Sequence, residues 1–538
     1  MTIVTVLGST KSFIQSFFTG GDTLSTMIQL PDLCISDNTQ LVLSAVACLG
    51  VVGILVRAYR HKMESQLPLP PSPPTWRLWG HFLPYLHPSL VIAGWIEKYG
   101  PLITIRSKFE HIVIIGRYKA AIDIMENQGK FTADRPRMNP AGKMFNGAIS
   151  ISFVHFGDRF RRMRRTLHSH LQPKAAEAYQ PLQMSHAKNT VLSILDDPYN
   201  YHNHVITYAA TTIMKVAYGR SVPTSATDPE MVELSRRIKI SSVVRRPGTY
   251  LVDWIPWLQY LPWYGRDLKR SFERTKKLNI DRLNRVKEQM QSDKDIGPSF
   301  AKYMLENIHL HGLTEIEMAF LGGAFFVAGS STTSAAISTV LMAAACFPEE
   351  QAQVQAELDM VIGRHRAPTF ADQNSLPRLQ AFILEALRWR PPLPTGALAH
   401  RTTHDVIWEN YRIPAGTTLF ADHWSISRDP DAYPEPDAFK PQRWIDDQYR
   451  LRDDLKIFVF GFGRRVCPGQ HVANRSVFIN SLLTMWAFQL TLNPTKPLDD
   501  RGFMNGVMSI VPPCAIEFER RIPELELRRM MQHYPQDT

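Results

Sequence analysis

The fold is decided by residues 460–469, which read Phe-Gly-Phe-Gly-Arg-Arg-Val-Cys-Pro-Gly. Two glycines before Cys467 and one after it allow the backbone to bend sharply and to approach a flat ligand closely. A metal-bound thiolate needs hydrogen-bond donors, and a helix that starts near Gly469 offers unpaired N–H groups and a positive dipole end. Arg465 can pair with a carboxylate of the same ligand through two N–H groups.

A buried structural role is the alternative for Cys467, since cysteine is among the most buried residue types. Ten constrained residues in a row make that alternative weak. The pattern F-x-x-G-x-R-x-C-x-G matches at Phe460, Gly463, Arg465, Cys467 and Gly469. The stretch therefore resembles the haem loop of cytochromes P-450, in which a cysteine thiolate is the axial ligand of the iron. This resemblance implies a haem b cofactor bound through Cys467, with Arg465 at a haem propionate.

The composition is that of a large globular protein with a positive net charge. The 538 residues are 44% hydrophobic, and 61 basic against 50 acidic residues give a net charge of +11. This charge favours anionic partners without choosing between nucleic acid, membrane and acidic protein. The cysteines are scattered and include no C-x-x-C pair, which argues against a disulfide scaffold or a zinc ribbon and favours a reducing compartment. They are Cys34, Cys48, Cys346, Cys467 and Cys514.

Residues 41–56 form an apolar stretch of about 16 residues, slightly shorter than the usual span of about 20. A short anchor, a signal core and a buried helix are all compatible with it. Basic residues follow the stretch and acidic ones precede it, so the positive-inside rule places the downstream chain in the cytosol. A cleaved signal would have the opposite polarity. We therefore expect a transmembrane anchor at about 41–56.

The expected domain organisation follows from this anchor. Residues 1–66 are an N-terminal segment that contains it. Residues 67–74 are rich in proline, which predicts an extended and stiff hinge. Residues 75–538 are then the catalytic domain. Because membrane-bound members of the resembled family carry a proline-rich segment at this place, the resemblance implies a single-pass protein of the endoplasmic reticulum membrane with a cytosolic catalytic domain.

The remaining patterns predict a mainly α fold with a minor β-sheet. Short β-branched runs within 101–116 favour a hairpin. A long apolar helical pattern covers 315–342, and an amphipathic helix is predicted over 348–364. The resemblance implies the cytochrome P-450 fold, preceded by the membrane anchor.

A basic run occupies residues 156–165. On a helix, Phe160 and Arg164 share one face. The run resembles the family's W-x-x-x-R helix with Phe160 in the tryptophan position, so only Arg164 is carried over as a propionate ligand. Two interpretations of the other arginines stay open: a solvated helix face, or a docking site for the acidic surface of a reductase.

A second landmark is Ala328-Gly329-Ser330-Ser331-Thr332-Thr333 within the long apolar helix. Ala328 and Thr332 share a face, and Gly329 lowers helix propensity where a bound molecule needs room. The sequence resembles the family's oxygen-activation helix, [AG]-G-x-[DE]-T-[TS], which implies a catalytic role for Thr332. Ser331 replaces the acidic residue and would pass protons through ordered water. Hydrogen bonding of these hydroxyls to the helix backbone is the structural alternative.

Three further residues resemble the family's structural triad. Glu385 and Arg388 are three residues apart on a predicted helix, where an isolated pair would be a weak surface ion pair. Pro441-Gln442-Arg443-Trp444 follows later and resembles the P-x-R loop. The resemblance implies that Glu385, Arg388 and Arg443 form a buried triad. It also places His400 at a propionate.

The segment 250–264 contains three tryptophans and three tyrosines. These side chains favour a membrane–water interface because each joins an apolar ring to a polar tip. The segment could therefore enter the membrane near a substrate entrance. Ordinary core packing is the alternative.

Five landmarks occur in family order between about 68 and 524, and together they predict a membrane-anchored haem-thiolate monooxygenase. The expected partners are an NADPH–cytochrome P-450 reductase, cytochrome b5 and the membrane, but no nucleic acid. The implied specificity regions are 137–154, 240–250, 320–328, 394–399 and 506–510. Their apolar character predicts a lipophilic small-molecule substrate. The motifs are similar to those of fungal secondary-metabolism members of the family, which implies a role of that kind. The alternatives are a haem-thiolate isomerase or dehydratase that needs no reductase, and a non-catalytic haem-binding membrane protein.

Overall fold

The computed structural model describes residues 52, 67–75, 80–81, 83–84, 87–107, 110–220, 224–245, 249–253, 255–292, 297–396, 398–496, 498 and 515–535. Apart from Val52, the predicted anchor lies outside these residues, as does the specificity region 506–510. The chain from Leu67 to Thr538 forms one compact unit.

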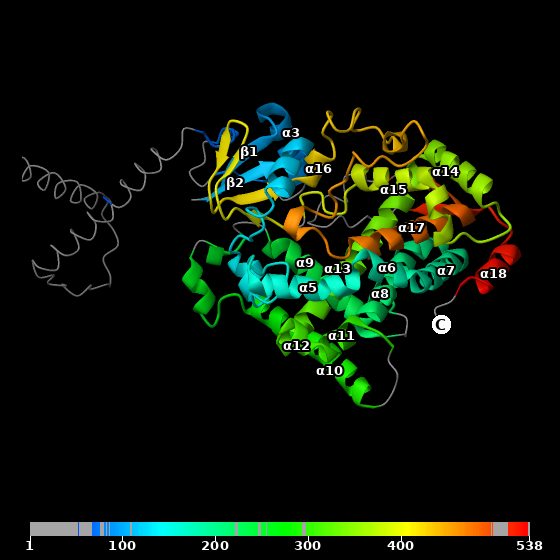
Figure 1. Cartoon of the computed structure of the whole chain (residues 1–538), viewed down its shortest axis with the longest axis horizontal. Coiled ribbons are helices and arrows are strands. Elements are labelled where there is room, and N and C mark those ends of the chain that lie inside the picture. Colours follow the sequence, from blue (N-terminus) through cyan, green and yellow to red (C-terminus); the bar gives the residue numbers. More distant parts are fainter. Residues whose placement is uncertain are drawn as a thin grey trace, which may run out of the picture. The chain divides into compact units, whose positions relative to one another are not determined.

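Helices dominate the described chain, as expected (Figure 1). They are α3 (Pro88–Tyr99), α4 (Tyr118–Ala121), α5 (Asp158–Leu171), α6 (Pro173–Ala178), α7 (Gln180–Asp196), α8 (Tyr201–Tyr218), α9 (Pro229–Val244), α10 (Arg266–Gln291), α11 (Phe300–Glu306), α12 (Ile308–His311), α13 (Glu315–Cys346), α14 (Pro348–Val361), α15 (Pro377–Trp389), α16 (His423–Ile426), α17 (Gln470–Ala487) and α18 (Glu524–Gln532). The predicted helices at 315–342 and 348–364 correspond to α13 and α14.

The described strands form small sheets. They are β1 (Leu102–Ser107), β2 (Glu110–Ile115), β3 (His400–Arg401), β4 (Val406–Trp408), β5 (Tyr411–Ile413), β6 (Thr418–Ala421), β7 (Phe488–Leu492) and β8 (Ile516–Arg520). The largest sheet has the order β1-β2-β6-β3, with β2 and β6 parallel and the other pairs antiparallel. The hairpin predicted within 101–116 is confirmed as β1 and β2. This sheet places His400 opposite Leu419.

Helix α13 runs through the middle of the helical region (Figure 1). A capping box begins it: the Thr314 hydroxyl accepts from the Glu317 amide, and the Glu317 carboxylate accepts from the Thr314 amide. Arg159 of α5 donates to the same carboxylate at 2.7 Å. Among the described residues, α13 is the one helix long and apolar enough to span a membrane, but 72% of its apolar window is buried in the protein. It is therefore a core helix.

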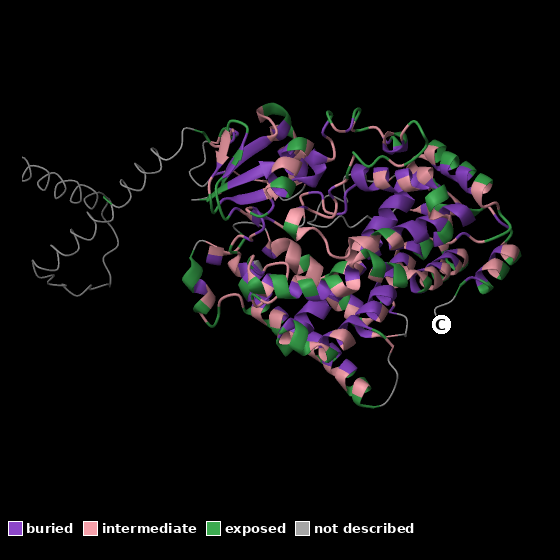
Figure 2. Ribbon diagram, in the orientation of Figure 1, coloured by how far each residue is buried: buried purple, intermediate pink, exposed green. Residues whose placement is uncertain are grey.

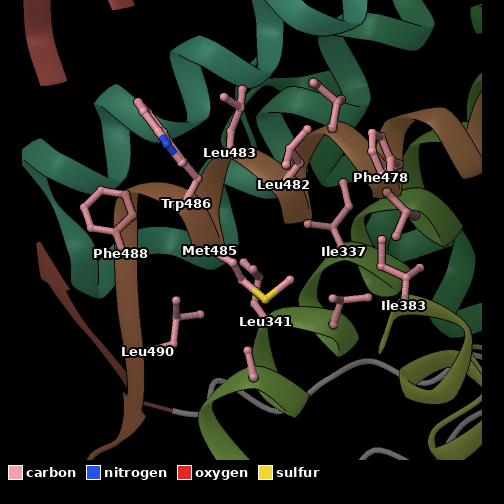
Figure 3. Close-up of a cluster of buried hydrophobic side chains, with 14 of the residues drawn as sticks. Ile337, Leu341, Ile383, Phe478, Leu482, Leu483, Met485, Trp486, Phe488 and Leu490 are labelled. Carbon is pink, nitrogen blue, oxygen red and sulfur yellow. The ribbon is translucent and has the colours of Figure 1, made fainter. Parts of the chain in front are cut away.

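The largest hydrophobic cluster joins α13 to α15 and α17 (Figure 3). Ile337 and Leu341 come from α13, Ile383 comes from α15, and Leu482 and Trp486 come from α17. Buried residues follow these central helices, whereas exposed residues gather on outer helices such as α14 (Figure 2). This packing fixes α17, and with it the cysteine loop that precedes it, against α13.

The proline-rich residues 67–74 lie against the sheets in extended coil. The Thr104 amide of β1 donates to the Pro71 carbonyl at 2.7 Å, and the Thr104 hydroxyl donates to the Pro70 carbonyl at 2.8 Å. The Arg412 amide of β5 donates to the Pro68 carbonyl at 2.9 Å. These bonds attach the segment to two sheets, because proline keeps its carbonyl acceptor although it lacks an N–H donor.

The structure brings Glu385, Arg388 and Arg443 together. Arg388 and Glu385 are fully buried and form two hydrogen bonds of 2.8 Å. Arg443 donates to Glu385 at 3.2 Å. A fourth partner was not predicted: the Trp444 indole N–H donates to Glu385 at 2.9 Å. Such a carboxylate is satisfied on both oxygens, which is what a buried charge requires.

We expect Glu385→Gln to destabilise the fold by about 3–5 kcal/mol, because it leaves two guanidinium groups buried without their carboxylate. Chemical denaturation of the purified protein would measure this loss. The matched control is Asp446→Asn, which removes a surface ion pair with Arg450 and should change the stability far less. Equal effects of the two substitutions would contradict the expectation.

Candidate active site beside Cys467

A closed turn holds the sulfur of Cys467. The Cys467 amide donates to the Phe460 carbonyl at 2.8 Å, across the short helical turn Gly463–Arg465. Helix α17 starts immediately afterwards, with Gly469 at its N-cap. The predicted arrangement, a cysteine just before a helix N-terminus, is therefore present.

The glycines of this loop serve different purposes. Gly463 has a left-handed φ of +49°, and a Cβ there would lie 2.4 Å from the Met125 carbonyl oxygen. The space beside Gly463 is thus filled by the backbone of Met125, whereas we expected this glycine to leave space for a ligand. A Cβ on Gly469 would have only the Cys467 sulfur within 4 Å, at 3.9 Å. The open space needed for a flat ligand therefore lies at Gly469 and at Gly461, which has no atom within 4 Å of its Cβ position and also lines the cavity described below.

A cavity of about 330 Å³ lies beside the sulfur. Of the residues predicted for the site, those that line it are Ala328, Gly329, Thr332, His400, Phe460, Arg465, Cys467 and Gly469. Ser331, Arg164 and Gly463 do not line it. Apart from Arg135, Arg465 and two histidines, the described lining is uncharged, and it contains no carboxylate. The part of α13 around Ala328 and Thr332 and the cysteine loop therefore face one shared space.

The Cys467 side chain is half-buried because it borders this cavity. Burial raises the pKa of the thiol, while the Gly469 amide and the charge of Arg164 act in the opposite direction. Both opposing groups favour the thiolate, which is the form that binds metals.

Arg465 is held by main-chain carbonyls and forms no ion pair among the described residues, although the charge of Asp134 acts on it. Its Nε donates to Ala133 at 2.7 Å, and its two terminal nitrogens donate to Ile151 at 3.3 Å and Val154 at 2.7 Å. Burial lowers its pKa to about 10. A guanidinium has five N–H donors, so two remain for a ligand in the cavity.

Phe160 and Arg164 take different places, although both belong to the same helix α5. Phe160 is buried, and its ring stacks on the Arg465 guanidinium at 3.7 Å. Arg164 is half-buried and makes no hydrogen bond within the described chain. Burial lowers the pKa of Arg164, and the charge of Cys467 opposes this effect. Phe160, which stands in the place of the family's tryptophan, thus orients Arg465 by stacking. The N–H groups of Arg164 remain available to a ligand.

His400 is buried at the edge of the largest sheet. Its Nδ1 lies 2.9 Å from the Thr132 carbonyl, and because a carbonyl only accepts, Nδ1 carries the proton. Burial and the nearby charge of Arg135 lower the pKa of this histidine well below its usual range. A carboxylate in the cavity would favour the protonated ring, in which Nε2 also donates.

Arg135 is a cavity residue that the sequence analysis missed. It is buried, lines the cavity and donates to the carbonyls of Ser152, Leu398 and Ala399. Burial and the charge of Arg465 lower its pKa well below its usual range. Its position just before the predicted specificity region 137–154 was the only available signal.

On α13, the side-chain hydroxyls of Ser331 and Thr332 donate to the helix backbone. Thr332 donates to the Ala328 carbonyl and Ser331 to the Val327 carbonyl, each at 2.7 Å. The structural alternative is therefore correct for these bonds, although Thr332 also lines the cavity. A Cβ on Gly329 would lie 2.8 Å from the Ile213 side chain of α8. Close helix packing thus requires this glycine, and the need for ligand room is not its only explanation.

The predicted specificity regions contribute unequally. Lining residues come from 137–154 (Ile151 and Ser152), from 320–328 (Ala324, Phe325 and Ala328) and from 394–399 (Thr395, Gly396 and Leu398). No described residue of 240–250 lines the cavity.

A haem fits this donor set. In the described chain no group of three or more His, Cys, Asp or Glu could hold a bare metal ion. Cys467 would therefore suit a metal whose other ligands belong to a cofactor. The space at Gly469 would accept the flat ring. Arg135, Arg465 and Arg164 retain N–H donors and lack carboxylates, which two propionates would supply.

Comparison with known proteins agrees with this geometry. A model of the cytochrome P450 family matches residues 70–518. The chain belongs to the cytochrome P450 family. Cytochrome P450 monooxygenase 113 of Postia placenta is 42% identical over 489 residues, which cover 90% of this chain and 98% of the relative. Cytochrome P450 monooxygenase 64 of the same organism is 41% identical over 485 residues, with 90% and 98% covered.

A cytochrome P450 monooxygenase of Armillaria gallica is 32% identical over 468 residues, covering 84% of this chain and 88% of the relative. The resemblance seen at the cysteine loop is therefore confirmed. The predicted enzyme class, a cytochrome P450 monooxygenase, is confirmed with it. The mainly helical structure with small sheets agrees with this family.

We expect Gly463→Ala to destabilise this P450 more than Gly461→Ala. Both positions have positive φ, +49° and +77°, so both substitutions incur about 1–2 kcal/mol of backbone strain. Only the Cβ at 463 also meets the Met125 carbonyl, whereas nothing lies within 4 Å of the one at 461. Thermal-unfolding midpoints would test this order. Equal losses would show that the contact with Met125 is unimportant.

Proposed function

We propose that this cytochrome P450 inserts one oxygen atom from O2 into a lipophilic small molecule, with electrons from NADPH through a separate reductase. Haem b would occupy the cavity, with Cys467 as its axial ligand. One observation carries the proposal: the Cys467 sulfur and the Thr332 helix face line the same apolar cavity. When bound, the haem supplies the chemistry that activates dioxygen and transfers one oxygen atom to the substrate.

The protein groups around the sulfur hold its charge. The Gly469 amide and the Arg164 guanidinium both lower the pKa of Cys467 against the effect of burial. The haem carboxylates would be held by a set of cationic or protonatable groups with open donors. We assign to this set Arg135, Arg164, His400 and Arg465.

Thr332 is the proposed catalytic residue on the opposite wall, with Ala328 and Gly329 beside it. The Thr332 hydroxyl donates to the Ala328 carbonyl. The lone pairs of the hydroxyl oxygen remain able to accept a hydrogen bond from a donor in the cavity. Ser331 does not line the cavity, so it would act on proton delivery only through ordered water. The apolar wall around these residues excludes bulk water from the reacting atoms.

We propose that the electron donor docks beside α5. Arg162 and Arg165 are exposed on this helix, whereas Arg159 and Arg161 are engaged with Glu317 and Asp158. A reductase with an acidic surface would be steered to the exposed pair, because opposite charges accelerate encounter. Cytochrome b5 would use the same charge complementarity.

We also propose a location at the endoplasmic reticulum membrane, with residues 41–56 as the anchor. The described part of segment 250–264 supports membrane contact. Its side chains at Leu251, Trp257, Tyr260 and Trp263 are exposed by 60% or more, while Val252 and Leu258 are buried. Exposed aromatic side chains of this type favour the membrane interface. The apolar cavity and the fungal relatives support a lipophilic secondary metabolite as substrate.

Replacing Cys467 by Ala tests the assignment. We expect the reduced carbon monoxide complex to lose its thiolate-type absorption, because alanine supplies no axial sulfur. The control is Cys346→Ala, which changes the other cysteine in the described chain and should leave the absorption unaltered. An unchanged spectrum in the Cys467 variant would refute haem-thiolate binding.

A second test concerns Ser331. We expect Ser331→Asp to raise the ratio of product formed to NADPH consumed, because a carboxylate relays protons better than a hydroxyl. Ser331→Ala removes the hydroxyl without adding an acid and is the matched control. The same ratio in all three proteins would mean that this position takes no part in proton delivery.

A further inference from the structure

The cavity beside Cys467 is poor in side chains that give up an electron easily. Its described lining contains no tyrosine, tryptophan or methionine, and Cys467 is the one sulfur-containing residue among the lining residues. A thiolate is itself readily oxidised, and oxidation beyond the sulfenic acid is in general irreversible. Oxidising equivalents that meet no substrate would therefore be consumed at Cys467, unless another side chain supplies the electrons.

A row of aromatic rings leads from the cavity towards the protein surface. Phe462 lines the cavity and stacks on Phe458, with 4.8 Å between the ring centroids. The Phe458 ring lies 5.1 Å from the ring of Tyr118, the first residue of α4. Tyr118 is only half-buried. Because electron transfer slows exponentially with distance, a row of adjacent rings connects the cavity to Tyr118 better than a gap of the same length would.

The proton decides which tyrosine in this row can be oxidised, since a phenol that loses an electron also loses its proton. Tyr433 lies next to Tyr118, with 5.8 Å between the ring centroids. The Tyr433 hydroxyl donates to the Lys456 carbonyl, which is a very weak base. The Tyr118 hydroxyl accepts from the Lys456 amide at 3.1 Å in an exposed position, so its own proton can pass to water. Tyr118 is therefore the tyrosine suited to oxidation.

Two tryptophans near the site are protected from oxidation by cations. Trp389 and Trp424 have guanidinium groups over their rings: Arg390 lies 3.9 Å from the Trp389 centroid, and Arg428 lies 3.2 Å from the Trp424 centroid. A cation over the face of a ring is attracted by the intact π-system. Loss of an electron would place a second positive charge beside the first, which Coulomb repulsion opposes.

The surroundings of Tyr118 differ in charge. Within the described part of the chain its ring contacts are with other aromatic rings and include no stacked cation. Burial raises the pKa of the Tyr118 phenol and the Lys456 amide lowers it. Of the two charged groups that act on it, Asp454 has a larger effect than Arg452. Negative charge nearby favours the loss of an electron.

We propose that Tyr118 is a protective electron donor, which removes oxidising equivalents from the cavity through Phe458 and Phe462 when no substrate is bound. The proposal rests on the proposed haem binding. The Tyr118 phenol loses one electron to the oxidised cofactor and its proton to water, which leaves a neutral phenoxyl radical and a cofactor reduced by one equivalent. A low-molecular-weight thiol then gives one hydrogen atom to the phenoxyl, which restores the phenol and forms a thiyl radical.

Tyr118→Phe is the informative variant, because it removes the phenol and keeps the ring. The holoenzyme without substrate is mixed with cumene hydroperoxide, which supplies oxidising equivalents without a reductase, and is rapidly frozen. Electron paramagnetic resonance then measures tyrosyl radical per haem, and absorbance measures the loss of haem with time. The matched control is Tyr199→Phe, because Tyr199 is 81% exposed and is the kind of phenol that peroxide reaches directly from solvent.

We expect the wild type to form a tyrosyl radical and Tyr118→Phe to lose this signal and to lose its haem faster. Tyr199→Phe should match the wild type in both measurements. A tyrosyl signal of wild-type size in Tyr118→Phe would overturn the protective role. So would the absence of a tyrosyl signal from wild-type protein that contains haem.

A second variant tests the row of rings without changing the phenol. Phe458→Leu removes the ring between Phe462 and Tyr118, and we expect it to lower the radical yield. A wild-type yield in this variant would overturn the route through Phe458.

A measurement on the wild type alone covers the case in which the variants do not fold. After reaction with cumene hydroperoxide and a nitroso spin trap, peptide mass spectrometry should find the adduct at Tyr118, and adducts only at other residues would overturn the proposal. Wild-type protein that binds no haem would instead overturn the proposed function itself, so the two failures can be distinguished.

Discussion

The closed turn before α17 is the constraint on which the site depends. The Cys467 amide reaches the Phe460 carbonyl at 2.8 Å, and Gly463 adopts a left-handed conformation with its backbone against Met125. Phe462 is buried between these points and stacks on Phe458. Because the turn is fixed on both sides and α17 is packed into the main core, the sulfur is held at the cavity independently of any substrate.

Buried arginine side chains are stabilised in two different ways in this protein. Near the core, Glu385 neutralises Arg388 and accepts from Arg443 and Trp444. At the cavity, Arg135 and Arg465 donate to main-chain carbonyls and form no ion pair within the described chain, and burial lowers the pKa of each although the charge of Asp134 opposes this effect. The first arrangement is complete in itself. In the second arrangement, the positive charge is neutralised only when a ligand supplies negative charge. This difference supports a cofactor with carboxylates.

Helix α13 performs two tasks with one sequence. Its central part approaches α8 so closely that Gly329 has no room for a side chain, while Ala328 and Thr332 line the cavity. Small residues thus permit tight packing against α8 directly beside an open space. The hydroxyl bonds of Ser331 and Thr332 to the backbone keep these polar groups satisfied inside an apolar helix.

Much of the architecture could be predicted from the chain because its causes are local. Periodicity indicated α13, α14 and the β1–β2 hairpin, and the spacing of Cys467, Arg465 and Gly469 indicated the ligand class. Contacts between distant segments could not be predicted. Examples are the stacking of Phe160 on Arg465 and the Met125 carbonyl beside Gly463. The position of Ser331 outside the cavity lining also depended on how α13 packs.

The sequence by itself determined the family and the helical character, and it singled out the cysteine that we propose as the iron ligand, since these follow from neighbours along the chain. Only the tertiary structure decided which cations meet at the cavity. Arg135 and Leu398 are 263 residues apart and yet joined by a hydrogen bond, because packing of the sheet and the central helices brings their segments together. No local sequence pattern predicts this contact, since it results from the packing of the whole core.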